Sequence, residues 1–255
     1  MKIFATYNIK GGVGKTATAV NIAYLAAQDG YRVLLWDLDP QGAASFLFRI
    51  KPRVKGGGKA LIAGKRPVDD AIKATDFENL DLLPADFTYR NLDLHLDSER
   101  KSTRRLRSLL LPLRREYDVV ILDCPPSISL LSENVLHAAD LLLVPLIPTT
   151  LSVRTLDQLT NFIADLDGQR PKILAFFSMI DRRKRLHQEI AEQLPTQRDD
   201  VAAIAIPALS AIERMSVQRA PVTATAPRSL AARCYRELWQ DARQRVRLPD
   251  PPAPP

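Results

Sequence analysis

The strongest chemical signal in the sequence is a short glycine-rich segment with a lysine at each end and a threonine after the second lysine. It reads Lys10-Gly11-Gly12-Val13-Gly14-Lys15-Thr16. It lies between an apolar run, residues 3–9, and a helical pattern, residues 17–28, and this strand–loop–helix order is the context in which a loop binds phosphates. Glycines let successive backbone N–H groups face one hollow, and the start of the helix adds donors and a favourable dipole. The loop amides and Lys15 should therefore hold phosphates, and Thr16 should ligate Mg²⁺.

Three aspartates follow later apolar runs. Asp37 and Asp39 leave the second run at alternate positions, so both should point toward the end of the sheet where ligands bind. An ordinary strand-end turn gives the same pattern, because Asp39-Pro40 is also a common turn dipeptide. Asp123 follows four apolar residues, which is the usual form of a metal-binding carboxylate at a strand end in phosphate-loop proteins.

The loop departs from the general phosphate-loop pattern, because Ile9 stands where that pattern has a glycine and Lys10 stands at the head. This deviant form resembles the ParA/MinD family of partition and positioning ATPases. The resemblance implies that Lys10 reaches across a dimer interface to the nucleotide held by the other subunit. It also implies that Asp39 orients the attacking water and that Asp37 supports the metal and the loop. Lys10, Lys15 and Asp39 are then the expected catalytic residues, Thr16, Asp37 and Asp123 the expected metal site, and ATP and Mg²⁺ the expected ligands.

The resemblance extends over residues 1–247. Cys124-Pro125-Pro126-Ser127 is similar to the family's small residue, two prolines and serine after the metal-binding aspartate. Met179 stands near the position expected for the base, and Pro207 precedes a loop that packs on adenine in the family. Two positions depart from the family, namely Ala17 in place of a second hydroxyl residue and Ala208 in place of an arginine. The expected nucleotide-binding residues are Gly11, Gly12, Val13, Gly14, Lys15, Thr16, Ala17, Met179 and Pro207.

Short apolar runs alternate with helical patterns along the chain. The runs cover residues 3–9, 31–36, 80–83, 119–122, 141–147, 173–179 and 201–206. The helical patterns cover residues 17–28, 68–75, 106–115, 130–138, 153–166, 186–194 and 229–246. Nearly continuous apolar strands that alternate with helices predict an α/β fold, in which helices cover both faces of a mostly parallel twisted sheet. We expect one P-loop ATPase domain over residues 1–247, a mobile surface excursion over residues 49–66, and a disordered proline-rich tail over residues 248–255.

Composition limits the class of protein. The chain has 255 residues, 46% of them hydrophobic and 25% charged, which is typical of a soluble globular protein. No apolar run is long enough to cross a bilayer, and the start lacks a signal-peptide pattern, so we expect a cytoplasmic protein. The two cysteines, Cys124 and Cys234, lack metal-binding spacing, which argues against zinc and iron–sulfur sites.

A net charge of +7 permits a polyanionic partner. Relatives bind nonspecific DNA as ATP-bound dimers, so the resemblance implies a nucleoid-associated homodimer released when a ParB-like or cargo adaptor protein stimulates hydrolysis. The alternative is a set of solvated helix faces on which arginines alternate with acidic residues. Membrane attachment is not expected, because the last helix lacks an apolar face opposite its arginines. The DNA-binding candidates are Arg182, Arg183, Arg185, Arg214 and Arg219.

Two other functions remain open at this point. The first is an ATP-dependent amide-forming synthetase of metabolism on the same fold, which would need a substrate pocket near the γ-phosphate. The second is a positioning ATPase for a protein cargo without a role in plasmid or chromosome segregation. The sequence does not separate the second function from DNA partition.

Overall fold

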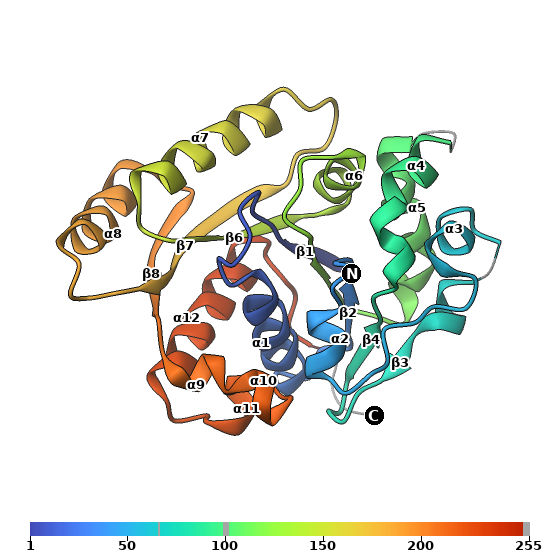
Figure 1. Ribbon diagram of the computed structural model, residues 1–255, viewed down its shortest axis with the longest axis horizontal. Coiled ribbons are helices and arrows are strands. Elements are labelled where there is room, and N and C mark those ends of the chain that lie inside the picture. Colours follow the sequence, from blue (N-terminus) through green and yellow to red (C-terminus); the bar gives the residue numbers. More distant parts are fainter. Residues whose placement is uncertain (66, 99–101, 252–255) are drawn as a thin grey trace.

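A largely parallel sheet organises the fold (Figure 1). The computed structural model describes residues 1–65, 67–98 and 102–251. In this part of the chain the sheet has eight strands in the order β3-β4-β2-β5-β1-β6-β7-β8, and only the β3–β4 pair is antiparallel. The strands are β1 Lys2–Thr6, β2 Val33–Asp37, β3 Lys73–Ala74, β4 Leu80–Leu83, β5 Val119–Asp123, β6 Leu141–Leu146, β7 Lys172–Ile180 and β8 Val201–Pro207.

Helices cover both faces of the sheet. Helices α1, α2 and α9–α12 pack on one face, and α3–α8 pack on the other (Figure 1). The first group is α1 Lys15–Gln28, α2 Ala43–Leu47, α9 Ser210–Glu213, α10 Met215–Gln218, α11 Val222–Thr225 and α12 Leu230–Arg245. The second group is α3 Gly57–Ile62, α4 Leu92–Asp97, α5 Arg105–Leu110, α6 Leu130–Ala138, α7 Thr150–Ala164 and α8 Arg185–Gln197. Short 3₁₀ segments are η1 Val68–Ala71, η2 Phe87–Asn91, η3 Ser102–Arg104 and η4 Leu111–Arg115.

The central strands explain why the apolar runs of the sequence are continuous rather than alternating. Every residue of β2, β5 and β6 is buried, because helices shield both faces of the sheet. The α/β class predicted from the sequence is therefore confirmed. Since neighbouring strands β2, β5 and β1 are parallel, the loops that follow them meet at one edge of the sheet. This edge holds the glycine-rich loop and all three aspartates.

The prediction of a mobile excursion over residues 49–66 is wrong for the residues that the structure describes, 49–65. Val54, Leu61 and Ile62 are buried in the core on the α3–α8 face, and α3 forms directly after the glycine triplet. The glycines allow the positive φ angles of the turn, 85° at Gly56 and 66° at Gly57. They do not keep the rest of the segment exposed. Residue 66 lies outside the described residues.

Two other segments differ from their predicted form. Residues 68–75 make the 3₁₀ turn η1 and the short strand β3 rather than one helix. The helix expected over 106–115 is α5 followed by η4, where Pro112 cannot donate a backbone hydrogen bond. Within the tail expected to be disordered, the carbonyl of Pro249 accepts a 2.8 Å hydrogen bond from the Tyr31 hydroxyl. Residues 252–255 lie outside the described part of the chain. Within that part, no helix combines the length and the apolar character needed to cross a membrane.

Candidate nucleotide-binding site

The glycine-rich loop joins β1 to α1 in a conformation that needs glycine. Gly12 and Gly14 have φ angles of 70° and 94°, in the left-handed region that other residues rarely adopt. A Cβ on Gly14 would lie 2.9 Å from the Ser178 Oγ of β7, so a side chain here would require the Ser178 hydroxyl to rotate away, in addition to the strain of the positive φ. Helix α1 begins immediately after Gly14, whose carbonyl accepts a 2.9 Å hydrogen bond from Thr18 N–H. The loop thus leads directly into a helix N-terminus, the kind of backbone arrangement that binds anions.

The two lysines of the loop have different surroundings. Lys15 is buried, and its Nζ donates a 2.9 Å hydrogen bond to the carbonyl of Lys10. Burial lowers the pKa of Lys15, while the Asp123 carboxylate opposes this shift. The ammonium of Lys10 is partly exposed and has no hydrogen bond or ion pair to any residue that the structure describes. Lys15 is therefore directed along the loop, and Lys10 remains available to another molecule.

Asp37 and Asp123 occupy neighbouring places at the ends of β2 and β5, where they are paired in register. Both are buried. Asp37 Oδ2 accepts hydrogen bonds of 2.7 Å from the N–H and from the hydroxyl of Ser45, and Asp123 Oδ1 accepts one of 3.1 Å from the Thr6 hydroxyl. The remaining oxygens, Asp37 Oδ1 and Asp123 Oδ2, are buried without a hydrogen-bond partner. Burial raises the pKa of both carboxyl groups. The charge of Asp39 raises the pKa of Asp37 further, and the charges of Asp37 and Asp39 raise that of Asp123 further.

These unpaired oxygens fit a hard divalent cation. Buried carboxylate oxygens are nearly always satisfied, so two orphaned ones on residues paired at neighbouring strand ends indicate a missing partner. The predicted metal ligands Thr16, Asp37 and Asp123 offer only oxygen, the donor that Mg²⁺ prefers. A cation here would also relieve the repulsion between the two aspartates. The residues present therefore fit Mg²⁺.

Asp39 lies beyond the end of β2 and lines a cavity of about 340 Å³ beside the loop. Its Oδ1 accepts a 2.9 Å hydrogen bond from the Gln41 N–H, which fixes the carboxylate in a tight turn. The cavity also brings together the predicted residues Met179 and Pro207, although 160 residues or more separate them from the loop. The lining residues are Gly11, Gly12, Gly14, Lys15, Thr16, Ala17, Asp39, Pro126, Ser178, Met179, Pro207, Ala208, Leu209, Ile212, Glu213 and Tyr235.

Some expected residues do not line this cavity, and some lining residues were not expected. Val13 is buried in the loop, and Asp37, Asp123 and Lys10 lie outside the lining. The resemblance placed a loop after Pro207 near adenine, but the sequence did not single out Leu209, Ile212, Glu213 or Tyr235. The helical pattern over 229–246 could have placed Tyr235 on a buried face, but no local signal directs it to a nucleotide. The two departures from the family pattern, Ala17 and Ala208, both line the cavity.

Comparison with known proteins agrees with this geometry. A family model described as an AAA domain matches residues 1–176. The sporulation initiation inhibitor protein Soj of Bacillus subtilis (strain 168) is 34% identical over 246 residues, which cover 94% of this chain and 97% of Soj. The chain belongs to the ParA/MinD family. Chromosome partitioning protein ParA of Myxococcus xanthus is 36% identical over 199 residues, which cover 76% of this chain and 70% of that protein.

The fold of this chain also matches a solved structure that contains bound ligands. That structure is cobyrinic acid a,c-diamide synthase from Mycobacterium smegmatis with ADP and magnesium. It has a TM-score of 0.79 and 28% sequence identity and covers 100% of both chains. Nucleotide and magnesium use in this fold is consistent with the cavity and the orphaned oxygens described above.

The DNA-binding candidates differ in how far they are occupied by other contacts. Arg183 pairs with Asp181 at 3.0 Å, and Arg185 pairs with Glu189 at 2.7 Å, both on the surface. Arg219 donates a 2.9 Å hydrogen bond to the carbonyl of Phe46, and its guanidinium lies 4.5 Å from the centre of that ring. Arg182 and Arg214 form no side-chain ion pair with the residues that the structure describes. Of the five candidates, Arg219 is the one whose contacts give it a structural role.

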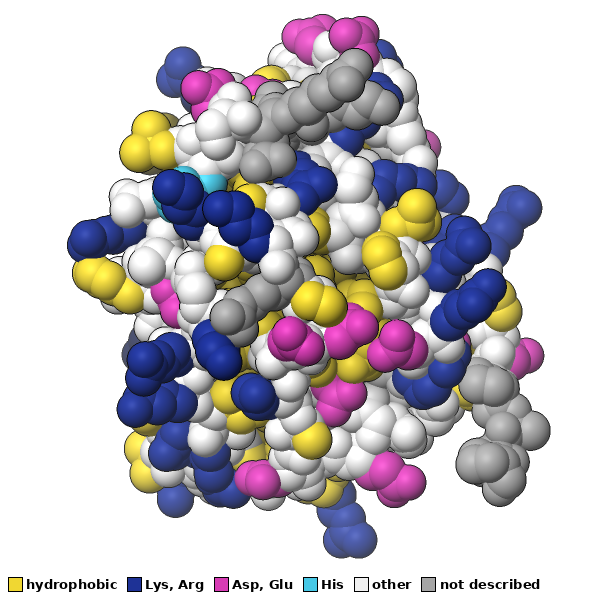
Figure 2. Space-filling view, turned by 90° about the vertical axis from the view of Figure 1, so that its right-hand side faces the viewer, with side chains coloured by type: hydrophobic (Ala, Val, Ile, Leu, Met, Phe, Trp, Pro, Cys, Tyr) yellow, Lys and Arg dark blue, Asp and Glu magenta, His cyan; other side chains and the backbone are white. Residues whose placement is uncertain are grey.

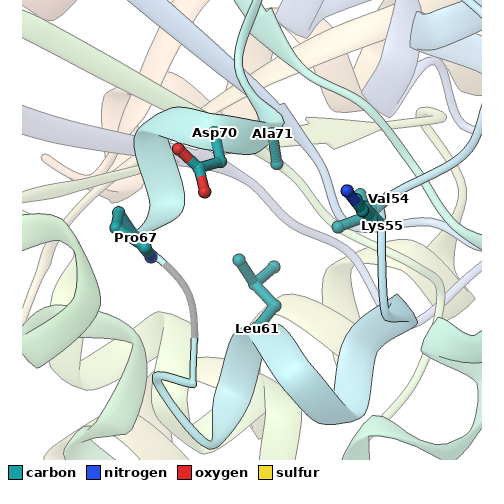
Figure 3. A pocket seen from close by; sticks show the side chains of 6 residues that line it. All are labelled: Val54, Lys55, Leu61, Pro67, Asp70 and Ala71. Carbon is teal, nitrogen blue, oxygen red and sulfur yellow. The ribbon is translucent and has the colours of Figure 1, made fainter.

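A second hollow lies away from the loop, on the side of the molecule that carries α3 and α4. On this side lysines and arginines surround a centre of hydrophobic and acidic side chains (Figure 2). The hollow measures about 250 Å³, and Leu61 points into it from α3 while Asp70 points in from the opposite wall (Figure 3). It shares no lining residue with the nucleotide cavity. Its wall includes Val54 and Lys55, so the segment expected to be mobile instead shapes this surface.

Proposed function

We propose that this protein is a ParA-like ATPase that uses ATP to switch between a free and a paired state. The carrying observation is the phosphate loop at the sheet edge, with Lys15 held along it and two buried carboxylate oxygens left unpaired beside it. Family membership adds a relative of 34% identity over nearly the full length of both chains. ATP is the substrate, and hydrolysis of its terminal phosphoanhydride bond is the reaction.

Each part of the edge has one role in this proposal. The loop amides and Lys15 bind the phosphates, and Met179 and Pro207 contact the base. Thr16, Asp37 and Asp123 would hold Mg²⁺, which when bound would neutralise negative charge on the phosphates. Asp39 accepts a hydrogen bond from the attacking water and orients it. A positioned carboxylate suffices for this step, because phosphoryl transfer depends mainly on alignment and charge stabilisation.

Lys10 acts on the second subunit. Its ammonium is partly exposed and makes no hydrogen bond or ion pair with the described part of the chain. A phosphate of the nucleotide bound to the other subunit can therefore be its partner. ATP with Mg²⁺ then draws two subunits face to face, and each Lys10 contacts the nucleotide of the other. Removal of the γ-phosphate removes this contact and separates the dimer. The nucleotide state thereby controls pairing.

The paired state binds nonspecific DNA through its arginines. Net charge of +7 supports contact with phosphate backbones, which needs no reading of bases. Arg219 is the weakest of the five candidates, because its guanidinium contacts the carbonyl and the ring of Phe46. The other four candidates, whose side chains make no such contact, are Arg182, Arg183, Arg185 and Arg214. A ParB-like or cargo adaptor protein stimulates hydrolysis and releases the dimer, which segregates DNA or positions a protein cargo on the nucleoid.

An amide-forming synthetase is the second candidate, and one observation favours it. The M. smegmatis structure that matches this chain over its full length is named as such an enzyme. The curated relatives with higher identity, 34% and 36%, are Soj and ParA. This difference in identity supports a partition ATPase as the first candidate.

The two candidates are separated by binding of a random-sequence DNA duplex at two salt concentrations, with ATP, ADP or no nucleotide. The proposal predicts binding with ATP and Mg²⁺ only, which weakens strongly as salt rises. Lys15→Ala is the matched control, and addition of ATP and Mg²⁺ should no longer induce DNA binding by this variant. DNA binding that ignores the nucleotide contradicts the proposal. ATP turnover that requires a small carboxylic acid substrate, with no effect of DNA, identifies a synthetase instead.

A further inference from the structure

Ser45, in the short helix α2, contacts Asp37 through two different groups. Its backbone N–H and its hydroxyl each lie 2.7 Å from Asp37 Oδ2, and the residue is completely buried. The turn that brings Ser45 back to the strand end includes Gly42, whose φ angle is 66°. None of the motifs considered in the sequence includes Ser45.

A third contact fixes the direction of the Ser45 hydroxyl. Its oxygen accepts a 2.9 Å hydrogen bond from Ala85 N–H, in the segment that follows β4. A serine hydroxyl has one hydrogen to donate. Since Ala85 occupies the acceptor side, that hydrogen is directed to Asp37 Oδ2. Asp37 therefore has one oxygen held by two donors and one oxygen, Oδ1, left without a partner.

We infer that Ser45 is a positioning residue for the metal site. By holding Oδ2 it sets the rotation of the Asp37 carboxylate and leaves Oδ1 as the oxygen available to a divalent cation. This inference rests on the proposed function, in which Asp37 supports Mg²⁺. Groups that hydrogen-bond a metal-ligating side chain typically change metal affinity by about 10- to 100-fold when removed.

The anchor of Ser45 is itself fixed. Asp86, next to Ala85, accepts hydrogen bonds from Val54 N–H at 2.8 Å and from the Thr88 hydroxyl at 2.6 Å. The Thr88 oxygen in turn accepts a 2.7 Å hydrogen bond from Gly58 N–H. Thr88 thus stabilises the same layer without contacting Asp37, which makes Thr88→Val a matched control for loss of structure alone.

The test measures binding of a fluorescent ADP to the purified full chain, with saturating Mg²⁺ and with EDTA. ADP is chosen because subunit pairing then does not contribute to affinity. The measured quantity is the dissociation constant in EDTA divided by the dissociation constant with Mg²⁺. This ratio isolates the part of the affinity that depends on the metal. Ser45→Ala should lower this ratio by about tenfold and leave the EDTA affinity within about twofold of the parent. Ser45→Thr, which keeps the hydroxyl, should restore the ratio.

Three outcomes would overturn the inference: a folded Ser45→Ala protein with the parental ratio, no rescue by Ser45→Thr, or an equal loss in Thr88→Val. Should the alanine variant fail to fold, Ser45→Cys gives the same comparison, because a thiol keeps the volume but donates weakly. Asp37→Asn separates this inference from the proposed function. If Asp37→Asn keeps the parental ratio, the metal role of Asp37 is wrong. If Asp37→Asn lowers the ratio of dissociation constants and Ser45→Ala leaves it at the parental value, only the positioning role of Ser45 is wrong.

Discussion

Replacing Asp123 with asparagine should stabilise the metal-free protein at alkaline pH. Asp123 is fully buried beside Asp37, and burial together with that neighbouring charge raises the pKa of Asp123 to about 8. Between the ordinary value of an aspartate, about 4, and this raised value, the folded protein binds a proton that the unfolded chain releases. The free energy of unfolding therefore falls as pH rises through this window. Asparagine cannot ionise, so the variant should lack this loss.

The structure sets the size of the effect. Neighbouring strands lie about 4.8 Å apart, so two carboxylates in register at their ends are separated by about 5 Å. At an effective dielectric constant of about 20, two unit charges at this distance repel by about 3 kcal/mol. For a chain of this size each kcal/mol changes the melting temperature by about 2–4 °C. Asp123→Asn should thus melt roughly 6–12 °C above the parent at pH 9, with the difference much reduced at pH 6.

The assay is thermal unfolding in EDTA at pH 6 and pH 9, and Asp86→Asn is the matched control. Burial alone would raise the pKa of Asp86, but hydrogen bonds from Thr88 and Val54 outweigh it and lower that pKa. Its ionised form stabilises the fold above pH 4, so the control variant should melt lower than the parent at both pH values. If Asp123→Asn melts below the parent at pH 9, or shifts equally at both pH values, the repulsion between the two strand-end carboxylates is refuted.

The remaining predictions concern the loop, the water and DNA. Lys15→Ala should weaken ATP binding by at least about 10-fold, the value of a charge-assisted hydrogen bond, and titration with a fluorescent ATP checks this; parental affinity would contradict the phosphate role of Lys15. Asp39→Ala should retain ATP binding and accumulate ATP-bound dimers with hydrolysis lost, measured by phosphate release and size-exclusion chromatography; parental turnover would contradict the water-positioning role. Arg182→Ala should reduce the slope of DNA affinity against salt by about 1 if this side chain contacts one phosphate. An unchanged slope would remove Arg182 from the DNA contacts.

The sheet and the phosphate loop could be predicted because their signals are local. Strands shielded on both faces show continuous apolar runs, and the loop's glycines and lysines carry their chemistry within seven residues. Residues 49–65 misled the interpretation for the same reason. Three glycines among lysines are typical of a mobile loop, and only contacts with distant elements bury Val54, Leu61 and Ile62. A six-residue helix such as α3 is also too short to show a helical period.

Parts of the site depend on residues that meet only in the folded chain. Leu209, Ile212 and Glu213 line the candidate nucleotide cavity from the segment after β8. The resemblance placed a loop after Pro207 near adenine, but nothing in the types or spacing of these three residues singled them out. The two contacts of Ser45 with Asp37 depend on a turn across eight residues and on Ala85 from the segment that follows β4. Such arrangements follow from tertiary structure rather than from a motif.

The mass of the purified protein, saturated with a nonhydrolysable ATP analogue and Mg²⁺, tests the central claim most directly. Light scattering behind a sizing column should give a dimer with the analogue, a monomer with ADP, and a monomer for Lys10→Ala under either condition. Lys10→Ala should still bind the nucleotide, because its backbone carbonyl rather than its ammonium contacts Lys15. A parent protein that stays monomeric with the analogue, or a Lys10→Ala variant that pairs as well as the parent, would contradict the account.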